Sequence, residues 1–323
     1  MALNMITRSN AEALIPEQIS NEIINSVPAS SAFLQMAKAL PRMTSKQLKI
    51  PVATGLVEAG FVSGDSAQKP TSNMTWDKVY ITAEEIAVMV PIPEAVLDDA
   101  NYDIWSEVKP RIAEAFGRAI DAAAFYGINA PSTAPAGGIY GQAVNAGNVV
   151  VLSGSTKNLY EEILGEGGVV AKVEEQGIPV NGYVGALALR AKLRGCLDAN
   201  KQPIFRPAYS NGAAGTMSYE IDGNQVVFPS TVDMQECTDG DGYLIAGNFD
   251  YARYAVRQDI TYKIFDQGTI TDGSGKVVLS AMENDTVILR AVMRIGWAFP
   301  KPVNGISGTE YFPFAVLKAP GDA

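Results

Sequence analysis

Residues 61–129 constrain the fold of this 323-residue chain more than any other segment. A polar, glycine-bearing turn leads into a long stretch of alternating apolar and polar residues, which predicts a strand with two different faces. Pro-Ile-Pro at 91–93 ends this strand, and a long amphipathic pattern follows. Because a two-stranded ribbon is only marginally stable alone, the segment predicts a ribbon that needs a partner surface.

The alternation changes phase inside the ribbon. Ile81 belongs to one apolar series, but after Glu85 the apolar residues are Ile86 and Val88, which lie on the opposite parity. Since a shift of one residue moves every later side chain to the other face of a strand, we expect a bulge or bend here. Residues 48–57 predict the preceding strand of the ribbon.

A single long helix is expected from about residue 103 to residue 127. Its apolar stripe repeats every four residues, and Asn101 or Asp103 can cap its start. Pro110 lies inside the pattern, which predicts a kink. The stripe consists of Ile104, Val108, Ile112, Phe116, Ile120 and Ala124.

The rest of the chain reads as a layered α/β body. Residues 158–176 and 187–199 have helical patterns, with a strand expected between them at 181–184. Glycine and proline dominate the linking sequence at 130–154. Further strands are expected at 225–228, 242–248, 252–256, 261–265, 276–280 and 287–299.

Composition excludes several classes of function. The 25 basic and 35 acidic residues give a net charge of -10, which argues against a protein that grips nucleic acid over a broad face. The chain has no histidine, so Ser-His-Asp and Cys-His catalysis and histidine zinc sites are excluded.

The other chemical signals favour structural explanations. Cys196 and Cys237 lack paired spacing, which favours buried thiols over a disulfide or metal site. The first ten residues do not resemble a signal peptide, and no apolar run reaches the length of a membrane span. We therefore expect a soluble, intracellular product without a membrane partner.

The acidic pairs and glycine clusters also favour structural roles over chemical ones. Adjacent carboxylates at 84–85, 98–99 and 161–162 diverge in direction, so we expect solvated charges. The Asp-Gly-Asp-Gly sequence at 239–242 lacks the ligand spacing of a calcium loop, and the glycines at 165–168 are not followed by Lys-Ser/Thr. No catalytic, cofactor-binding or metal-binding residue is predicted.

The order of elements resembles the major capsid proteins of tailed bacteriophages with the HK97-type fold. The residues that carry this resemblance are Ser-Ala-Gln-Lys-Pro at 66–70, Met-Thr-Trp at 74–76, Ile-Pro-Glu-Ala-Val-Leu-Asp-Asp at 92–99 and the long helix that leads to Gly-Ile-Asn at 127–129. Gly-Asn-Phe-Asp at 247–250 and the strand at 287–299 extend it more weakly.

The resemblance implies an α+β, HK97-like capsid fold. In that fold an extended E-loop hairpin lies over a neighbouring subunit, and a long spine helix runs along a peripheral domain. The implied divisions are an N-terminal arm with the segment leading out of it (1–50), the E-loop hairpin (51–90), the peripheral domain with the spine helix (91–134), the axial domain (135–245), the returning peripheral strands (246–305) and a C-terminal strand of the axial domain (306–323).

It also implies the residues that build the assembly. Those of the intersubunit E-loop are Gly60, Gly64, Lys69, Pro70 and Trp76. Those of the spine helix are Ile104, Val108, Pro110, Ile112, Phe116 and Ile120. Some relatives crosslink an E-loop lysine to an asparagine of the next subunit, and Lys69 lies in that region, although no partner asparagine is identified.

The function implied is that of a non-enzymatic major capsid protein without cofactors. Copies would form hexamers and pentamers of an icosahedral virion shell around double-stranded DNA, without sequence-specific binding. The protein would be made in the cytoplasm of the host bacterium and would work with a portal protein. Only about 50 residues precede the E-loop, which favours a separate scaffolding protein over a built-in one.

Two alternatives stay open at this stage. An encapsulin-like compartment shares the fold but encloses a protein cargo, so the contents of purified particles separate the two. A histidine-free hydrolase that uses carboxylates would instead be a monomer with a cleft. Its activity would be lost when those carboxylates are substituted.

Overall fold

The computed structural model describes residues 31–55, 57, 59–62, 68–69, 71–100, 104–153, 159–196, 205, 207–209, 217–229, 242–303 and 309–319. The chain forms two compact units, which we describe separately. The described part of unit 1 lies within Glu84–Phe116 and Val256–Ile295, and that of unit 2 within Ala29–Ala83, Gly117–Ala255 and Gly296–Ala323.

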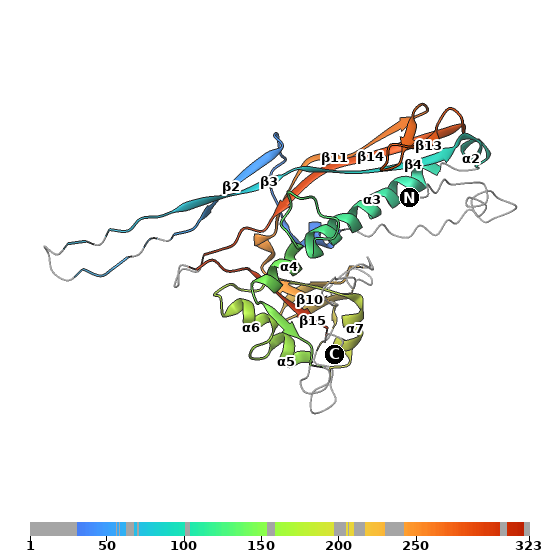
Figure 1. Ribbon diagram of the computed structural model, residues 1–323. Helices are drawn as coiled ribbons and strands as arrows, with labels where there is room; N and C mark the ends of the chain where they lie inside the picture. The colour runs from blue at the N-terminus through green and yellow to red at the C-terminus, as the bar shows by residue number, and fades with distance from the viewer. Residues whose placement is uncertain are drawn as a thin grey trace. The chain divides into compact units, whose positions relative to one another are not determined.

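Unit 1 is built on a sheet of long strands (Figure 1). β4 (Glu84–Pro93) pairs antiparallel with β14 (Thr286–Ala298), from Glu84 opposite Ile295 to Pro93 opposite Thr286. β11 (Arg253–Phe265) is the neighbour of β14 on its other side. A short hairpin of β12 (Thr269–Thr271) and β13 (Val277–Ser280) connects β11 with β14. The sequence predicts two strands at 252–256 and 261–265, but they form the single strand β11.

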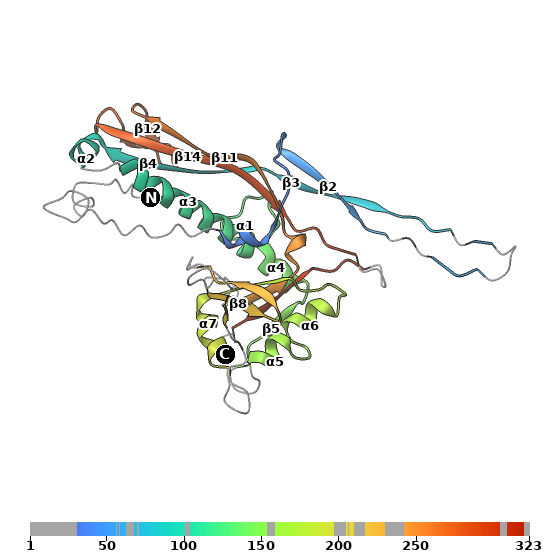
Figure 2. The same ribbon diagram turned by 180° about the vertical axis from the view of Figure 1, so that it is seen from behind.

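One face of this sheet carries the long helix. α2 (Glu94–Asp99) follows β4 directly, and its Val96 packs with Ile92 and Ile104 in a small apolar core. α3 (Ile104–Asp121) runs along the sheet (Figures 1 and 2). The Tyr262 hydroxyl of β11 lies 3.5 Å from the Lys109 carbonyl oxygen, to which it donates a hydrogen bond. Tyr262 therefore faces the helix, and its neighbours in β11 face away from it.

The predicted helix and its end are confirmed. α3 continues into a π-helical turn, η1 (Ala122–Tyr126), and Gly127 ends it in the left-handed conformation with φ 70°. That conformation favours glycine because a side chain would collide with the backbone. Pro110 lies within α3 and is exposed; the kink there stays a prediction. The proposed caps at residues 101 and 103 lie outside the described residues.

Unit 2 contains a mixed sheet of the order β5-β15-β10-β6-β9-β8-β7. Tyr183, Leu244 and Leu317 face a core shared with three helices, α5 (Leu159–Leu164), α6 (Val169–Glu174) and α7 (Leu187–Arg194). Their strand neighbours Val184 and Ile245 are also buried, so both faces of the sheet are covered. The strands are β5 (Val149–Val151), β6 (Gly182–Gly185), β7 (Pro207–Tyr209), β8 (Met217–Ile221), β9 (Asn224–Val227), β10 (Gly242–Gly247) and β15 (Phe314–Lys318).

The helical prediction for residues 158–176 is wrong in one respect. Two short helices, α5 (Leu159–Leu164) and α6 (Val169–Glu174), replace one long helix. The chain turns between them because Gly167 adopts φ 74°, which a helix does not allow. The other helices of unit 2 are α1 (Ala32–Met36), α4 (Gly138–Asn145), α7 (Leu187–Arg194) and the 3-10 turn η3 (Phe249–Tyr251).

The predicted ribbon is a hairpin of unit 2 only as far as Thr82, because the residues after it form β4 and pair with β14 in unit 1. β2 (Gln47–Ala53) and β3 (Trp76–Thr82) pair antiparallel, from Gln47 opposite Thr82 to Ala53 opposite Trp76. β1 (Lys38–Ala39) precedes the hairpin and pairs parallel with the start of β11. The predicted change of phase is confirmed, but it lies slightly earlier than predicted: β3 ends at Thr82, β4 begins at Glu84, and the buried parity shifts at Ala83 and not after Glu85.

Candidate assembly interface

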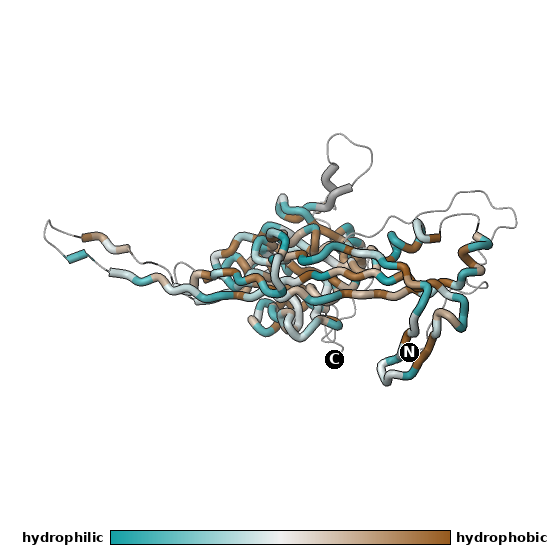
Figure 3. The backbone as a smooth tube through the Cα atoms, turned by 90° about the horizontal axis from the view of Figure 1, so that it is seen from above, coloured by the Kyte–Doolittle hydropathy of each residue, from teal (hydrophilic) through white to brown (hydrophobic). Residues whose placement is uncertain are grey.

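The outer part of the β2–β3 hairpin exposes large apolar side chains. Phe61 is fully exposed, and Trp76 has 63% of its surface accessible to solvent. One hydrophobic stretch lies on this part of the hairpin, among pale and hydrophilic stretches (Figure 3). The described apolar side chains that share this exposure are Val57, Phe61, Val62, Met74, Trp76 and Tyr80. Several large apolar side chains exposed along one hairpin favour an interaction site over a surface that stays in water.

The base of the hairpin is anchored in a core of its own. Ile50 of β2 and Ile81 of β3 pack with Met43, Ala255 and Ala298. A Cβ atom on Gly296 would lie 2.3 Å from the carbonyl oxygen of Thr82, so β14 approaches the hairpin base closely. The hairpin is therefore held firmly at its base, and farther out no described residue covers its apolar side chains.

The E-loop residues implied by the resemblance can be placed in part. Gly60, Lys69 and Trp76 are all exposed. Gly64 and Pro70 lie outside the described residues. The three placed residues lie on the uncovered part of the chain, where a partner can reach them.

The spine-helix residues differ from the hairpin in exposure. Most of them are buried inside the subunit, whereas Val108 is half-buried and Pro110 is exposed. They pack within the chain and leave little surface for a neighbour. The buried set is Ile104, Ile112, Phe116 and Ile120.

A buried carboxylate that the sequence does not reveal holds the start of α1. Asp121 Oδ1 accepts hydrogen bonds from the Ser31 hydroxyl at 2.5 Å and from the Phe33 amide at 3.0 Å. Its Oδ2 accepts one from the Ala32 amide at 3.0 Å. Burial raises the pKa of Asp121, while these hydrogen bonds act in the opposite direction. The contact fixes the start of α1 against the end of α3.

Asp121→Asn should change how subunit stability depends on pH. A raised pKa in the folded state favours folding most below the unfolded value of 3.8, and this contribution is lost as pH rises through the folded pKa. Relative to the Asn variant, wild type should therefore gain unfolding free energy as pH falls from 7 toward 4. Urea unfolding of subunits across this range measures the difference, and a difference that is constant with pH would contradict the assignment.

The expectation of solvated acidic pairs is wrong for Glu162. This side chain is 3% exposed. Its Oε1 accepts hydrogen bonds from the Ser153 amide and hydroxyl, each at 2.6 Å. Glu161 is exposed, so the two adjacent carboxylates face different surroundings. Glu162 stabilises the segment before α5, which is a structural role.

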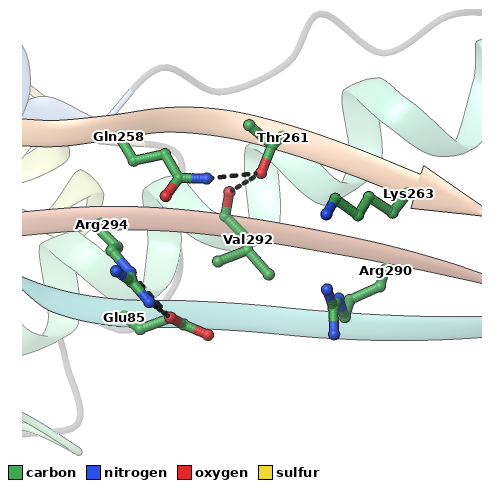
Figure 4. A pocket seen from close by; sticks show the side chains of 7 residues that line it. All are labelled: Glu85, Gln258, Thr261, Lys263, Arg290, Val292 and Arg294. Carbon is green, nitrogen blue, oxygen red and sulfur yellow. Dashed lines mark hydrogen bonds and ion pairs between the residues drawn. The ribbon is translucent and has the colours of Figure 1, made fainter.

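A second group missed by the sequence analysis lies on the sheet of unit 1. Lys263 of β11 and Arg290 and Arg294 of β14 line a hollow of about 180 Å³ together with Glu85 of β4. Figure 4 shows their side chains in front of the sheet, with a helix behind it. Arg294 donates to Glu85 Oε2 from Nε at 2.9 Å and from Nη2 at 2.6 Å. The sequence does hold one sign of this group. Residues 290 and 294 lie an even number of positions apart in a strand, so their basic side chains share one face.

Chemical sites of other kinds are absent from the described residues. These residues contain no group of three or more acidic or sulfur-bearing side chains that could hold a metal ion. Cys196 is buried and unpaired, and burial raises the pKa of its thiol, which makes it unreactive. Cys237 and the glycine-aspartate sequence at 239–241 lie outside the described residues. None of the described helices has the length and apolar character needed to span a membrane.

Comparison with known proteins gives consistent matches. The sequence profile of the Phage capsid family matches residues 11–302. The major capsid protein of Staphylococcus phage 80alpha is 25% identical over 320 residues, which cover 96% of this chain and 91% of that protein. A solved structure from Microbacterium phage Oxtober96 is 31% identical with a TM-score of 0.77, covering 98% of this chain and all of the other. One from Mycobacterium phage Cain is 26% identical with a TM-score of 0.77, covering 99% and 100%.

Proposed function

The chain belongs to the phage capsid family, and from this premise we propose that it is the major capsid protein of a tailed phage. Copies assemble into hexamers and pentamers that close an icosahedral shell. The observation that carries the proposal is the hairpin of β2 and β3. Its base is packed in a core, and its outer apolar side chains lack cover within the described residues. A second copy supplies that cover, so assembly stabilises what one subunit leaves exposed.

The divisions implied by the sequence fit this function. We propose that residues 1–50 form an arm and that residues 51–90 form the loop that overlaps a neighbour. Residues 91–134 and 246–305 then provide the peripheral domain, and residues 135–245 and 306–323 the axial domain. Gly60, Gly64, Lys69, Pro70 and Trp76 act at the overlap, and the helix with Pro110 bends as the shell changes size.

The proposed partners follow from the same role. The shell encloses double-stranded DNA without binding a sequence, and the net charge of -10 limits adhesion of the genome to the protein. A separate scaffolding protein directs assembly, and a portal protein occupies one position of the shell. The subunit is made in the host cytoplasm and then resides in the virion. Its role is structural and not enzymatic.

Neither alternative is favoured by the observations. An encapsulin-like compartment shares the fold, but the three relatives compared above come from phages. The hydrolase requires carboxylates gathered in a cleft. Within the described residues, the acidic side chains examined either hold backbone amides, as Asp121 and Glu162 do, or pair with arginine, as Glu85 does.

Electron microscopy of particles tests the proposal. The chain is expressed alone and together with the genes of its own phage, and the products are treated with nuclease before imaging. We expect closed shells of uniform size and, from infected cells, protected double-stranded DNA inside them. A chain that stays monomeric by light scattering under all these conditions would contradict the proposal, and shells filled with an enzyme would favour the compartment.

A further inference from the structure

The hollow on the sheet of unit 1 contains more positive charge than the subunit neutralises. We call Lys263, Arg290 and Arg294 the basic pocket. Glu85 pairs with Arg294, but among the described residues no carboxylate lies within salt-bridge distance of Lys263 or Arg290. The Arg290 Nε is buried without a hydrogen-bond partner, although its guanidinium lies over the Phe265 ring at 4.9 Å.

This arrangement is unfavourable in an isolated subunit. Like charges on neighbouring strands repel one another, and a buried donor without an acceptor loses its hydration without replacement. The chain as a whole has a net negative charge, so a local excess of cations is not expected from its composition. An oxyanion placed between Lys263 and Arg290 would remove both costs, because it accepts hydrogen bonds and neutralises charge.

The opposite end of the same sheet carries exposed carboxylates. Glu94 and Asp98 lie one turn apart on α2, and the Glu94 amide donates to the Asp285 carbonyl oxygen at 2.9 Å, which brings the turn before β14 beside α2. Glu283 and Asp285 of this turn are exposed, as are the two carboxylates of α2. We call Glu94, Asp98, Glu283 and Asp285 the acidic end.

The acidic end does not neutralise the basic pocket of its own subunit. Thr286 pairs with Pro93 beside the acidic end, and Arg290 lies four positions farther along β14, which is about 13 Å at the usual rise of a strand. Across this separation, none of the described carboxylates of the acidic end lies within salt-bridge distance of Lys263 or Arg290. We therefore look for the missing carboxylate on another molecule.

We propose that the acidic end of one copy docks in the basic pocket of the next copy. The two surfaces are different patches of the same chain, so the contact is head-to-tail. Such a contact closes into a ring when the rotation between copies is suitable. This inference rests on the proposed function, since it names residues by which one subunit selects and orients the next.

A carboxylate from a second copy fits the pocket better than a nucleic acid phosphate does. A polyanion is held by many cations spread over a face, whereas here three are gathered on an otherwise acidic chain. Glu85 also lines the hollow and pairs with Arg294, which leaves two cations for an incoming anion. A single carboxylate needs only the two cations that Glu85 leaves unpaired.

Charge reversal on each side tests the contact. The pocket variant carries Lys263→Glu and Arg290→Glu, the end variant carries Glu94→Lys and Asp98→Lys, and a combined variant carries all four. Arg294 is kept so that its pair with Glu85 persists. Particle yield is measured by sedimentation and electron microscopy, and unfolding temperatures confirm that each subunit folds. Lys301→Glu, at an exposed position in unit 2, is the control for a simple change of charge.

We expect the pocket and end variants each to lose particle yield by about tenfold or more, as breaking close ion pairs does. The combined variant should recover most of the yield, and the control should match wild type. Normal particles from the pocket variant would overturn the contact while leaving the proposed function intact. The contact would also be overturned if the combined variant did not recover its particle yield. A third contrary result would be a loss of binding to double-stranded DNA in the pocket variant alone. Absence of wild-type particles would instead contradict the proposed function.

Discussion

Deletion of residues 60–73 should abolish shells while leaving the subunit folded. The base of the hairpin, with Ile50 and Ile81, packs in the body of unit 2 and is not touched by the deletion. The removed segment contains the exposed Phe61 and Val62. Because burial of one large apolar side chain contributes about 2 kcal/mol, a shell that repeats this contact at every subunit loses much of its cohesion. Electron microscopy and light scattering of the purified variant measure the result.

A pair of point variants separates assembly from folding at the same hairpin. Trp76→Ser removes an exposed side chain, so the unfolding temperature of the subunit should change little, but particle yield should fall. Ile81→Ser places a hydroxyl at a position with 0% exposure and should lower the unfolding temperature itself. Normal shells from both the deletion and Trp76→Ser would remove the hairpin from the assembly mechanism.

Gly138→Ala should destabilise unit 2 strongly. Gly138 adopts φ 61°, and a Cβ atom there would lie 2.7 Å from the Gly127 nitrogen and 2.8 Å from the Ala124 carbonyl oxygen. Backbone atoms cannot rotate away as side chains do, so α4 would have to move from the end of η1. We expect a loss of about 2 to 5 kcal/mol from the combination of backbone strain and overpacking, measured by urea unfolding.

Gly147→Ala is the matched control for this substitution. Gly147 adopts φ 76°, but a Cβ atom there would have no neighbour within 4 Å. It therefore reports the cost of the left-handed backbone alone, which is about 1 kcal/mol. Equal losses of unfolding free energy in the two variants would show that the close approach between α4 and η1 adds nothing to the cost of Gly138→Ala.

The elements with strong local patterns were predictable from the sequence. The hairpin, the change of phase at Ala83 and the helix that ends at Gly127 all follow from the spacing of neighbouring residues. The break between α5 and α6 was less clear, because the apolar spacing on both sides of Gly167 continues one helical pattern.

The contacts of the buried acids were not predictable, for a physical reason. Asp121 looks like an ordinary polar residue at the edge of an amphipathic stripe, and its partner Ser31 lies far away in the sequence. Glu162 looks the same as Glu161, although only one of them is buried. The hollow that contains the basic pocket is lined by residues of β4, β11 and β14. It therefore depends on the order of the strands in the sheet, which the spacing of residues along the chain does not reveal.

The contact between Asp121 and Ser31 has a consequence for the order of events during synthesis. These residues are separated by 90 positions, so the chain must be translated almost to the end of α3 before the hydrogen bonds can form. At bacterial and eukaryotic elongation rates this interval is roughly 5 to 18 s. Throughout that time the start of α1 lacks its anchor. The start of α1 can therefore form these hydrogen bonds only after most of the long helix has been synthesised.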